Sequence, residues 1–223
     1  MDSKSTTRLA CVTVCTFLAT SAPAFSAAEL SVTVLNAAGA AVKGAVVVAE
    51  PVQSKVPQKP KQSAVMDQRD LQYVPDVLVI QTGTAVEFPN SDNVRHQVYS
   101  FSSAKAFQLA LYKGDAHAAI TFDRPGLVTL GCNIHDAMVG YIFVTDSPWY
   151  GRTDERGSLQ LHELAAGAYT VRLWHPLMDE GNAPLQTQIE LHDGTVGTAN
   201  FQLKRPLHPA LHSHGADSKW ADY

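Results

Sequence analysis

Three side chains that bind soft or borderline metals lie close together in the sequence, at Cys132, His135 and Met138. The residues before them, 127–129, and after them, 141–144, are apolar or β-branched, which predicts two strands of one hairpin joined by the loop that carries the three side chains. A thiolate and imidazoles hold copper in a trigonal plane, and a thioether binds weakly on its axis. Such a plane needs a second imidazole, for which His96 is the candidate.

The order of these residues resembles that of the type 1 copper cupredoxins. Asn90, five intervening residues, His96 and a β-branched strand are followed much later by Cys-x2-His-x2-Met. The short loop spacing is most similar to amicyanin-like members and to periplasmic cupredoxin-like proteins labelled as methylamine-utilisation proteins. The resemblance covers about residues 62–146, and four ligands in the right order make it specific.

The resemblance implies one type 1 copper site. Its equatorial ligands would be His96, Cys132 and His135, and its axial ligand would be Met138. Asn90 would tie the first ligand strand to the Cys132 loop. The protein would then be an electron-transfer carrier that alternates between Cu(I) and Cu(II), and not an enzyme. Its redox protein partner would dock near the exposed edge of His135.

Two other functions use the same features. A copper-binding or copper-delivery protein would use the same ligands without redox turnover, and a site that exchanges Cu(I) readily would favour it. A structural β-sandwich binding module would use the fold alone, although it has no need for the four ligands in register. Asp136 directly follows His135, and we hypothesise that its carboxylate raises the pKa of that imidazole.

The N-terminal segment 1–28 has the composition of a secretory signal peptide. Lys4 and Arg8 precede an apolar run over 9–18, and small residues follow it. The run is too short to cross a bilayer, so we expect export to the periplasm and no membrane span. Cleavage would leave Cys132 as the single cysteine, which cannot form an intramolecular disulfide and is therefore available to a metal.

Composition excludes several classes of function. The chain has 17 Lys and Arg against 21 Asp and Glu residues, so it lacks the basic footprint of a nucleic-acid-binding protein. No nucleophile elbow, phosphate-binding loop or paired-carboxylate constellation appears, and hydrolysis has no support in the sequence. Gly and Pro punctuate short alternating segments, which predicts an all-β fold.

Two distant segments resemble the halves of one module. The patterns at 32–46 and 153–171 are similar to the carboxypeptidase regulatory-like (transthyretin-like) sandwich, in which the halves are close in sequence. We therefore expect a Greek-key cupredoxin sandwich inserted into a loop of a second small β-sandwich. The expected parts are the discontinuous sandwich at 29–50 and 149–205, a linker at 51–61, the copper domain at 62–148 and a flexible His-containing tail at 206–223.

An alternative organisation makes residues 30–49 the first hairpin of the cupredoxin and leaves a smaller C-terminal sandwich. Within the inserted part, alternation predicts eight strands, which suffice for a Greek-key sandwich. These strands are expected near 63–67, 77–80, 85–88, 97–101, 107–111, 118–122, 127–130 and 140–145. The tail carries His208, His212 and His214, and whether this cluster collects metal stays open.

Overall fold

The computed structural model describes residues 27–53, 62–114, 118–179 and 185–209. These residues form seventeen β-strands and no helix, so the all-β prediction is confirmed. No helix in this part of the chain is long and apolar enough to cross a membrane. The expected signal peptide, except its last two residues, most of the expected linker and the tail from residue 210 lie outside the described residues.

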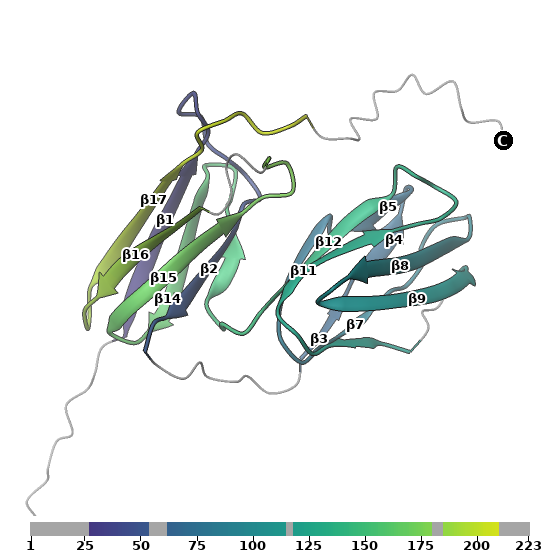
Figure 1. Cartoon of the computed structure of the whole chain (residues 1–223), viewed down its shortest axis with the longest axis horizontal. Helices are drawn as coiled ribbons and strands as arrows, with labels where there is room; N and C mark the ends of the chain where they lie inside the picture. Colours follow the sequence, from purple (N-terminus) through teal and green to yellow (C-terminus); the bar gives the residue numbers. More distant parts are fainter. Residues whose placement is uncertain (1–26, 54–61, 115–117, 180–184, 210–223) are drawn as a thin grey trace, which may run out of the picture.

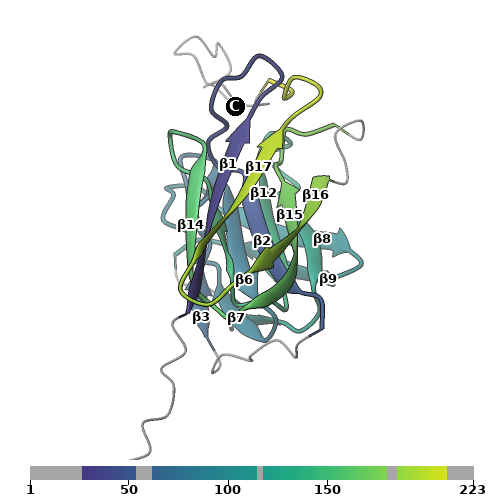
Figure 2. The same cartoon turned by 90° about the vertical axis from the view of Figure 1, so that its left-hand side faces the viewer.

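The outer sandwich, as we call it, combines the first two strands with the last five (Figures 1 and 2). One sheet has the order β14-β1-β17 and the other has the order β13-β2-β15-β16. β1 runs antiparallel to β14 and parallel to β17. The strands are β1 (Ala28–Leu35), β2 (Val46–Pro51), β13 (Tyr150–Arg152), β14 (Ser158–Leu164), β15 (Gly167–Trp174), β16 (Leu185–Leu191) and β17 (Val196–Gln202).

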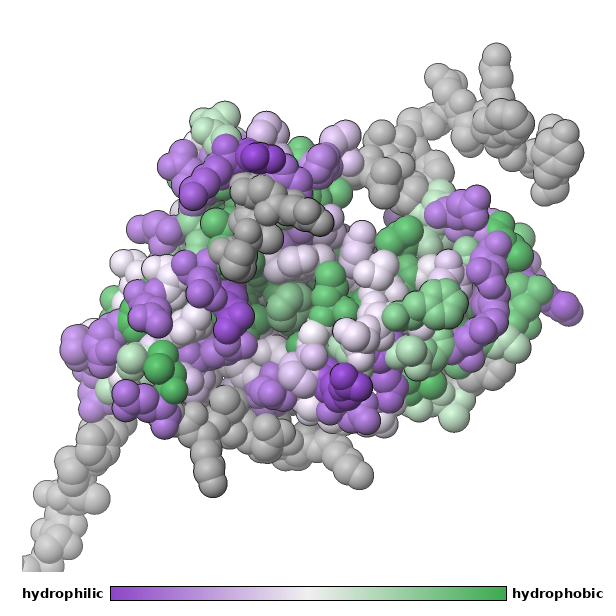
Figure 3. Space-filling model, viewed as in Figure 1, coloured by the Kyte–Doolittle hydropathy of each residue, from purple (hydrophilic) through white to green (hydrophobic). Residues whose placement is uncertain are grey.

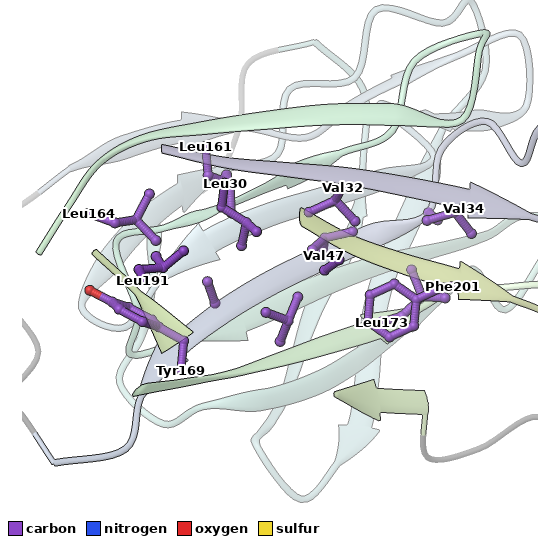
Figure 4. Close-up of a cluster of buried hydrophobic side chains, with 14 of the residues drawn as sticks. Leu30, Val32, Val34, Val47, Leu161, Leu164, Tyr169, Leu173, Leu191 and Phe201 are labelled. Carbon is purple, nitrogen blue, oxygen red and sulfur yellow. The ribbon is translucent and has the colours of Figure 1, made fainter. Parts of the chain in front are cut away.

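The core of the outer sandwich follows from strict alternation along β1. Leu30, Val32 and Val34 are fully buried between the two sheets, and the residues between them are partly exposed. Figure 4 shows these side chains facing those of the opposite sheet, including Tyr169 and Leu173 on β15. Aliphatic and β-branched side chains pack well on a half-buried pleated surface, which explains why this segment forms a strand.

The central sandwich, as we call it, contains the ten strands between residues 63 and 145. A five-stranded sheet of order β6-β12-β11-β8-β9 faces a three-stranded sheet of order β10-β7-β3, and β4 and β5 form a separate hairpin. The strands are β3 (Ser63–Val65), β4 (Asp67–Arg69), β5 (Gln72–Val74), β6 (Val77–Gln81), β7 (Thr84–Glu87), β8 (His96–Ser102), β9 (Lys105–Tyr112), β10 (Ile120–Phe122), β11 (Gly126–Gly131) and β12 (Val139–Thr145).

The pairing of strands keeps the two sandwiches separate. Among the described strands, β1 and β2 pair only with strands that begin at residue 150 or later, and the strands from 63 to 145 pair only with one another. This is the pairing expected of a central sandwich inserted between β2 and β13 of the outer one, and we propose that organisation. The hairpin predicted around the Cys132 loop is present as antiparallel β11 and β12.

Three local expectations differ from the structure. β2 (Val46–Pro51) continues through Pro51, a residue that we expected in the linker. The hairpin of β4 and β5 was not predicted as such, because its three-residue strands are too short and too polar to show an alternation of their own. The strand expected at 118–122 is limited to Ile120–Phe122.

The two sandwiches meet through aromatic and β-branched side chains. Val46 and Val48 of β2 and Val77 of β6 are buried together. Trp174 lies across the junction, with its ring centroid 5.4 Å from that of Tyr141 and with Phe143 also in contact. Figure 3 shows hydrophobic residues gathered where the sandwiches meet, whereas the visible face of the outer sandwich is largely polar.

An ion pair and a cleft lie beside this junction. Arg152 Nη1 of the outer sandwich is 2.8 Å from Asp76 Oδ1 of the central one. The neighbouring cleft has a volume of about 680 Å³. Its lining residues come from both sandwiches and include Lys43, Tyr73, Met138 and His175.

Candidate metal centre

Strand register brings the predicted ligands together at one end of the central sandwich. Cys132 follows β11 directly, and His135 lies in the turn between β11 and β12. Gly131, the last residue of β11, pairs with Tyr99 of β8, the strand that begins at His96. Residues far apart in the sequence therefore converge because β8 and β11 are neighbours in one sheet.

The three donor atoms form a compact triangle. The Nδ1 atoms of His96 and His135 are 3.1 Å apart, and Cys132 Sγ lies 4.0 Å and 3.7 Å from them, respectively. A triangle with these edges has a centre about 2 Å from each corner, which matches metal bonds of about 2.0–2.3 Å to imidazole nitrogen and thiolate sulfur. This is the only such group of potential ligands among the described residues.

The donors lie in a shielded environment. Cys132 and the ring of His96 are buried, and His135 is partly exposed. The His96 and His135 rings are edge to face, with centroids 4.8 Å apart. One thiolate with two imidazoles is a donor set typical of copper, and the closely packed hydrophobic cluster around Cys132 limits solvent access. The residues therefore fit a copper ion.

The environment of His135 favours its neutral form. Burial lowers the pKa of His135, the nearby His96 lowers it further, and the carboxylate of Asp92 opposes this effect. The hypothesis that Asp136 raises this pKa is wrong, because the shift has the opposite direction and Asp136 is exposed. A neutral imidazole is the form that binds metal.

Met138 closes the turn that carries two of the donors. Its backbone N–H donates to the carbonyl of His135 over 2.9 Å. Its side chain is buried in the same hydrophobic cluster as Cys132, and the residue also contributes to the cleft between the sandwiches. That its thioether binds copper as the axial ligand stays a proposal.

Asn90 has a different set of contacts from the one expected. Its Nδ2 donates to the carbonyls of Val94 and Tyr112, and its Oδ1 accepts from the N–H of Asp92. The described hydrogen bonds therefore tie the loop before His96 to the end of β9, rather than to the Cys132 loop. Asn90 still fixes the loop from which the first imidazole projects.

Two residues that hold parts of the candidate metal centre in place, Asp92 and Tyr73, were not identified from the sequence. Asp92 Oδ2 lies 2.6 Å from Nε2 of His96, on the side of the ring away from the donor triangle. Tyr73 donates its hydroxyl to the carbonyl of Gly131 over 2.9 Å, and burial raises its pKa far above the ordinary value. Neither contact could be predicted from the sequence, because a four-residue spacing indicates side-chain contact only on a helix and Asp92 and His96 do not lie on one.

The remaining histidines that the structure describes take part in other contacts. His175 Nε2 lies 3.2 Å from the carbonyl of Lys43, and His162 pairs with Glu29 on the surface. The N–H of His208 donates to the carbonyl of Leu177. His117, His212 and His214 lie outside the described residues, so the tail remains a prediction.

Comparison with known proteins gives partial matches among solved structures. No protein-family model matches the chain, and no curated protein matches it. A reduced amicyanin variant is 20% identical with a TM-score of 0.35 and covers 44% of this chain and 98% of its own. Amicyanin from Paracoccus versutus is 23% identical with a TM-score of 0.35, covering 44% of this chain and 97% of its own.

A copper enzyme also appears among these structures. The Cu-containing nitrite reductase from Thermus scotoductus SA-01 is 27% identical with a TM-score of 0.36. The match covers 43% of this chain but only 25% of that enzyme. With scores this low, the assignment of function rests on the fold and the residues of the chain itself.

Proposed function

We propose that this protein is an exported type 1 copper protein that carries electrons, with one copper ion held by His96, Cys132 and His135 and by Met138 on the axis. The observation that carries the proposal is the triangle of two Nδ1 atoms and one Sγ atom, all within bonding reach of a common centre. Bound copper would supply one-electron redox chemistry.

The surrounding chain supports electron transfer because it fixes the donors in advance. The β11–β12 hairpin positions Cys132 and His135, and the start of β8 positions His96. Hydrogen bonds from Tyr73 and to Asp92 hold the adjoining loops. Donors that are already in place need to move little when charge changes at the centre, which keeps the barrier to electron transfer low.

The exposed side of the site suits a transient protein partner. His135 is partly exposed, and the neighbouring Ile134 has half of its surface exposed (52%). Ala137 is also exposed on the same turn. A small apolar patch around a partly exposed ligand is suited to brief docking, and we propose a redox protein as the partner. No residue in this proposal acts on a substrate.

A Cu(II) titration of the mature protein tests the proposal, with visible absorption and EPR as readouts. We expect an intense thiolate-to-copper band and narrow hyperfine splitting. Both should disappear in Cys132→Ser and in His135→Gln and should persist in His162→Gln, which alters an exposed histidine of the outer sandwich. A weakly absorbing adduct that survives in Cys132→Ser would contradict a copper site at this triangle.

A second measurement separates electron transfer from copper delivery. The loaded protein would be reduced and reoxidised repeatedly in the presence of a Cu(I) chelator, while the visible band is followed. A carrier should recover the band in each cycle because copper stays bound. Rapid loss of copper to the chelator after reduction would favour delivery.

A further inference from the structure

We propose that Asp92 is a positioning residue of the metal centre, which orients His96 and favours Cu(II) over Cu(I) at the site. This inference rests on the proposed function, since it concerns the copper that His96 would bind. It assigns a role to a carboxylate that lies outside the ligand set and contacts only one of the ligands.

The first step of the argument is the orientation of the His96 ring. Asp92 Oδ2 lies 2.6 Å from Nε2, and Nδ1 on the other side faces His135 and Cys132. An ionised carboxylate can only accept a hydrogen bond, so the ring proton belongs on Nε2. The lone pair of Nδ1 is then directed at the donor triangle, as a metal ligand requires.

The second step is that the backbone is arranged to hold Asp92. The N–H groups of Asp70 and Leu71 donate to its two carboxylate oxygens over 2.6 Å and 3.0 Å. Both residues form the tip of the β4–β5 hairpin and have left-handed conformations, with φ of 53° and 58°. Leucine rarely adopts this conformation, and residues held in it concentrate at functional sites.

The hairpin tip and the preceding loop therefore fix the carboxylate from two sides. The N–H of Asp92 donates to Asn90 Oδ1, which anchors the backbone of the residue. Its side chain is only 11% exposed, so it is largely shielded from water.

The third step is the effect on the metal. A carboxylate that accepts the ring proton makes the imidazole a stronger donor and places a negative charge behind it. Both effects stabilise the more highly charged ion. Because the carboxylate and the ring are shielded from solvent, the interaction is screened less than one on the surface. Removal of this charge should weaken Cu(II) binding more than Cu(I) binding.

The test compares Asp92→Asn with Asp123→Asn in the full mature chain loaded with copper. Both variants lose one negative charge, but Asp123 is exposed and precedes β11 at the end remote from the Cys132 loop. The amide introduced by Asp92→Asn keeps one of the two acceptor oxygens, so it can hold only one of the two hairpin N–H groups, and a circular dichroism spectrum would check that the fold persists. We expect the Cu(II) to Cu(I) affinity ratio of Asp92→Asn to fall about tenfold, which raises the reduction potential by about 59 mV.

The outcomes separate this inference from the proposed function. A wild-type protein without the thiolate-to-copper band would overturn the proposed function. A wild-type protein with the band, in which Asp92→Asn has the same potential as Asp123→Asn, would overturn the role of Asp92 alone. The metal-free protein gives an independent readout by NMR, in which His96 should carry its proton on Nε2. A proton on Nδ1 instead would also overturn the assignment.

Discussion

The hydroxyl of Tyr73 donates to the carbonyl of Gly131, the residue that precedes Cys132, over 2.9 Å. This contact joins the β4–β5 hairpin to the end of the strand that presents the thiol. The ring of Tyr73 also packs against Gly140, where an added Cβ would lie 2.7 Å from the ring. The hairpin therefore contacts both strands that flank the candidate metal loop.

Replacement of Tyr73 by Phe tests the contribution of this hydrogen bond. The substitution keeps the ring but leaves the Gly131 carbonyl without this donor, which we expect to lower the free energy of unfolding by about 1 kcal/mol. Urea unfolding of the metal-free protein measures the effect. Tyr99→Phe is the matched control, since no hydrogen bond of its hydroxyl is described, and a loss as large in the control would contradict the assignment.

The Arg152–Asp76 ion pair across the junction should contribute more to stability than an exposed ion pair does. Arg152 binds Asp76 and also donates to the carbonyls of Gly44 and Val77. We expect Arg152→Gln to lower the free energy of unfolding by about 1–2 kcal/mol, because several hydrogen bonds to a partly buried group are lost. Thermal or urea unfolding provides the measurement.

The control for this prediction is Lys43→Gln, which breaks the exposed Lys43–Glu155 pair. Exposed pairs contribute about 0–1 kcal/mol, so the control should be nearly neutral. If Arg152→Gln and Lys43→Gln lower the free energy of unfolding by the same amount, Arg152 acts only as a surface charge.

Truncation of Trp174 should uncouple the two sandwiches. Its ring packs on Tyr141 and Phe143 of the central sandwich, and it belongs to the cluster of side chains that joins the two sandwiches. We expect Trp174→Ala to lower stability by about 3 kcal/mol and to separate one calorimetric transition into two. Trp149→Ala alters only the core of the outer sandwich, so it should lower stability while a single calorimetric transition remains. Two transitions in both variants would contradict a specific role of the junction.

Acid should lower the stability of the folded protein through His175. Burial lowers the pKa of His175, Arg152 lowers it further, and the Lys43 carbonyl and Asp76 act in the opposite direction. In the unfolded chain the imidazole takes up a proton near pH 6.5, whereas in the folded chain it does so only at lower pH. The unfolded state therefore binds more protons in this window, and the contribution of His175 to stability falls as pH decreases through it.

Urea unfolding of the metal-free protein at about pH 7.5 and about pH 5, on either side of the ordinary histidine pKa, measures this loss. We expect His175→Asn to lose less stability on acidification than the wild type does, because the titrating group is absent. His162→Gln, at an exposed position, should behave as the wild type. If His175→Asn loses as much stability on acidification as the wild type does, the prediction is wrong.

The sequence was informative where local pattern determines structure. Alternation along β1 and around the Cys132 loop predicted strands that the structure contains, and the spacing of Cys132 and His135 predicted two donors that do converge. His96 was the candidate for the second imidazole, and its role as a ligand followed from the resemblance to the cupredoxins. The strands and the spacing of Cys132 and His135 depend only on periodicity and short-range pattern.

The supporting contacts depend on tertiary structure and could not be predicted in the same way. The β4–β5 hairpin has short, largely polar strands, and its tip takes a conformation that Leu71 rarely adopts. The effect of Asp136 was misjudged because adjacency in sequence was taken as proximity to the ring, whereas burial and the neighbouring His96 dominate the pKa of His135.

The parallel pairing of β1 with β17 determines how the molecule would carry a mechanical load. A force that pulls the N-terminal end of β1 away from the C-terminal end of β17 would shear the ladder along Glu29–Leu35, so its hydrogen bonds would resist together rather than one at a time. The central sandwich joins the outer one between β2 and β13, which are neighbours in the other sheet. It lies outside this load path, so tension between the termini would leave the geometry of His96, Cys132 and His135 unstressed.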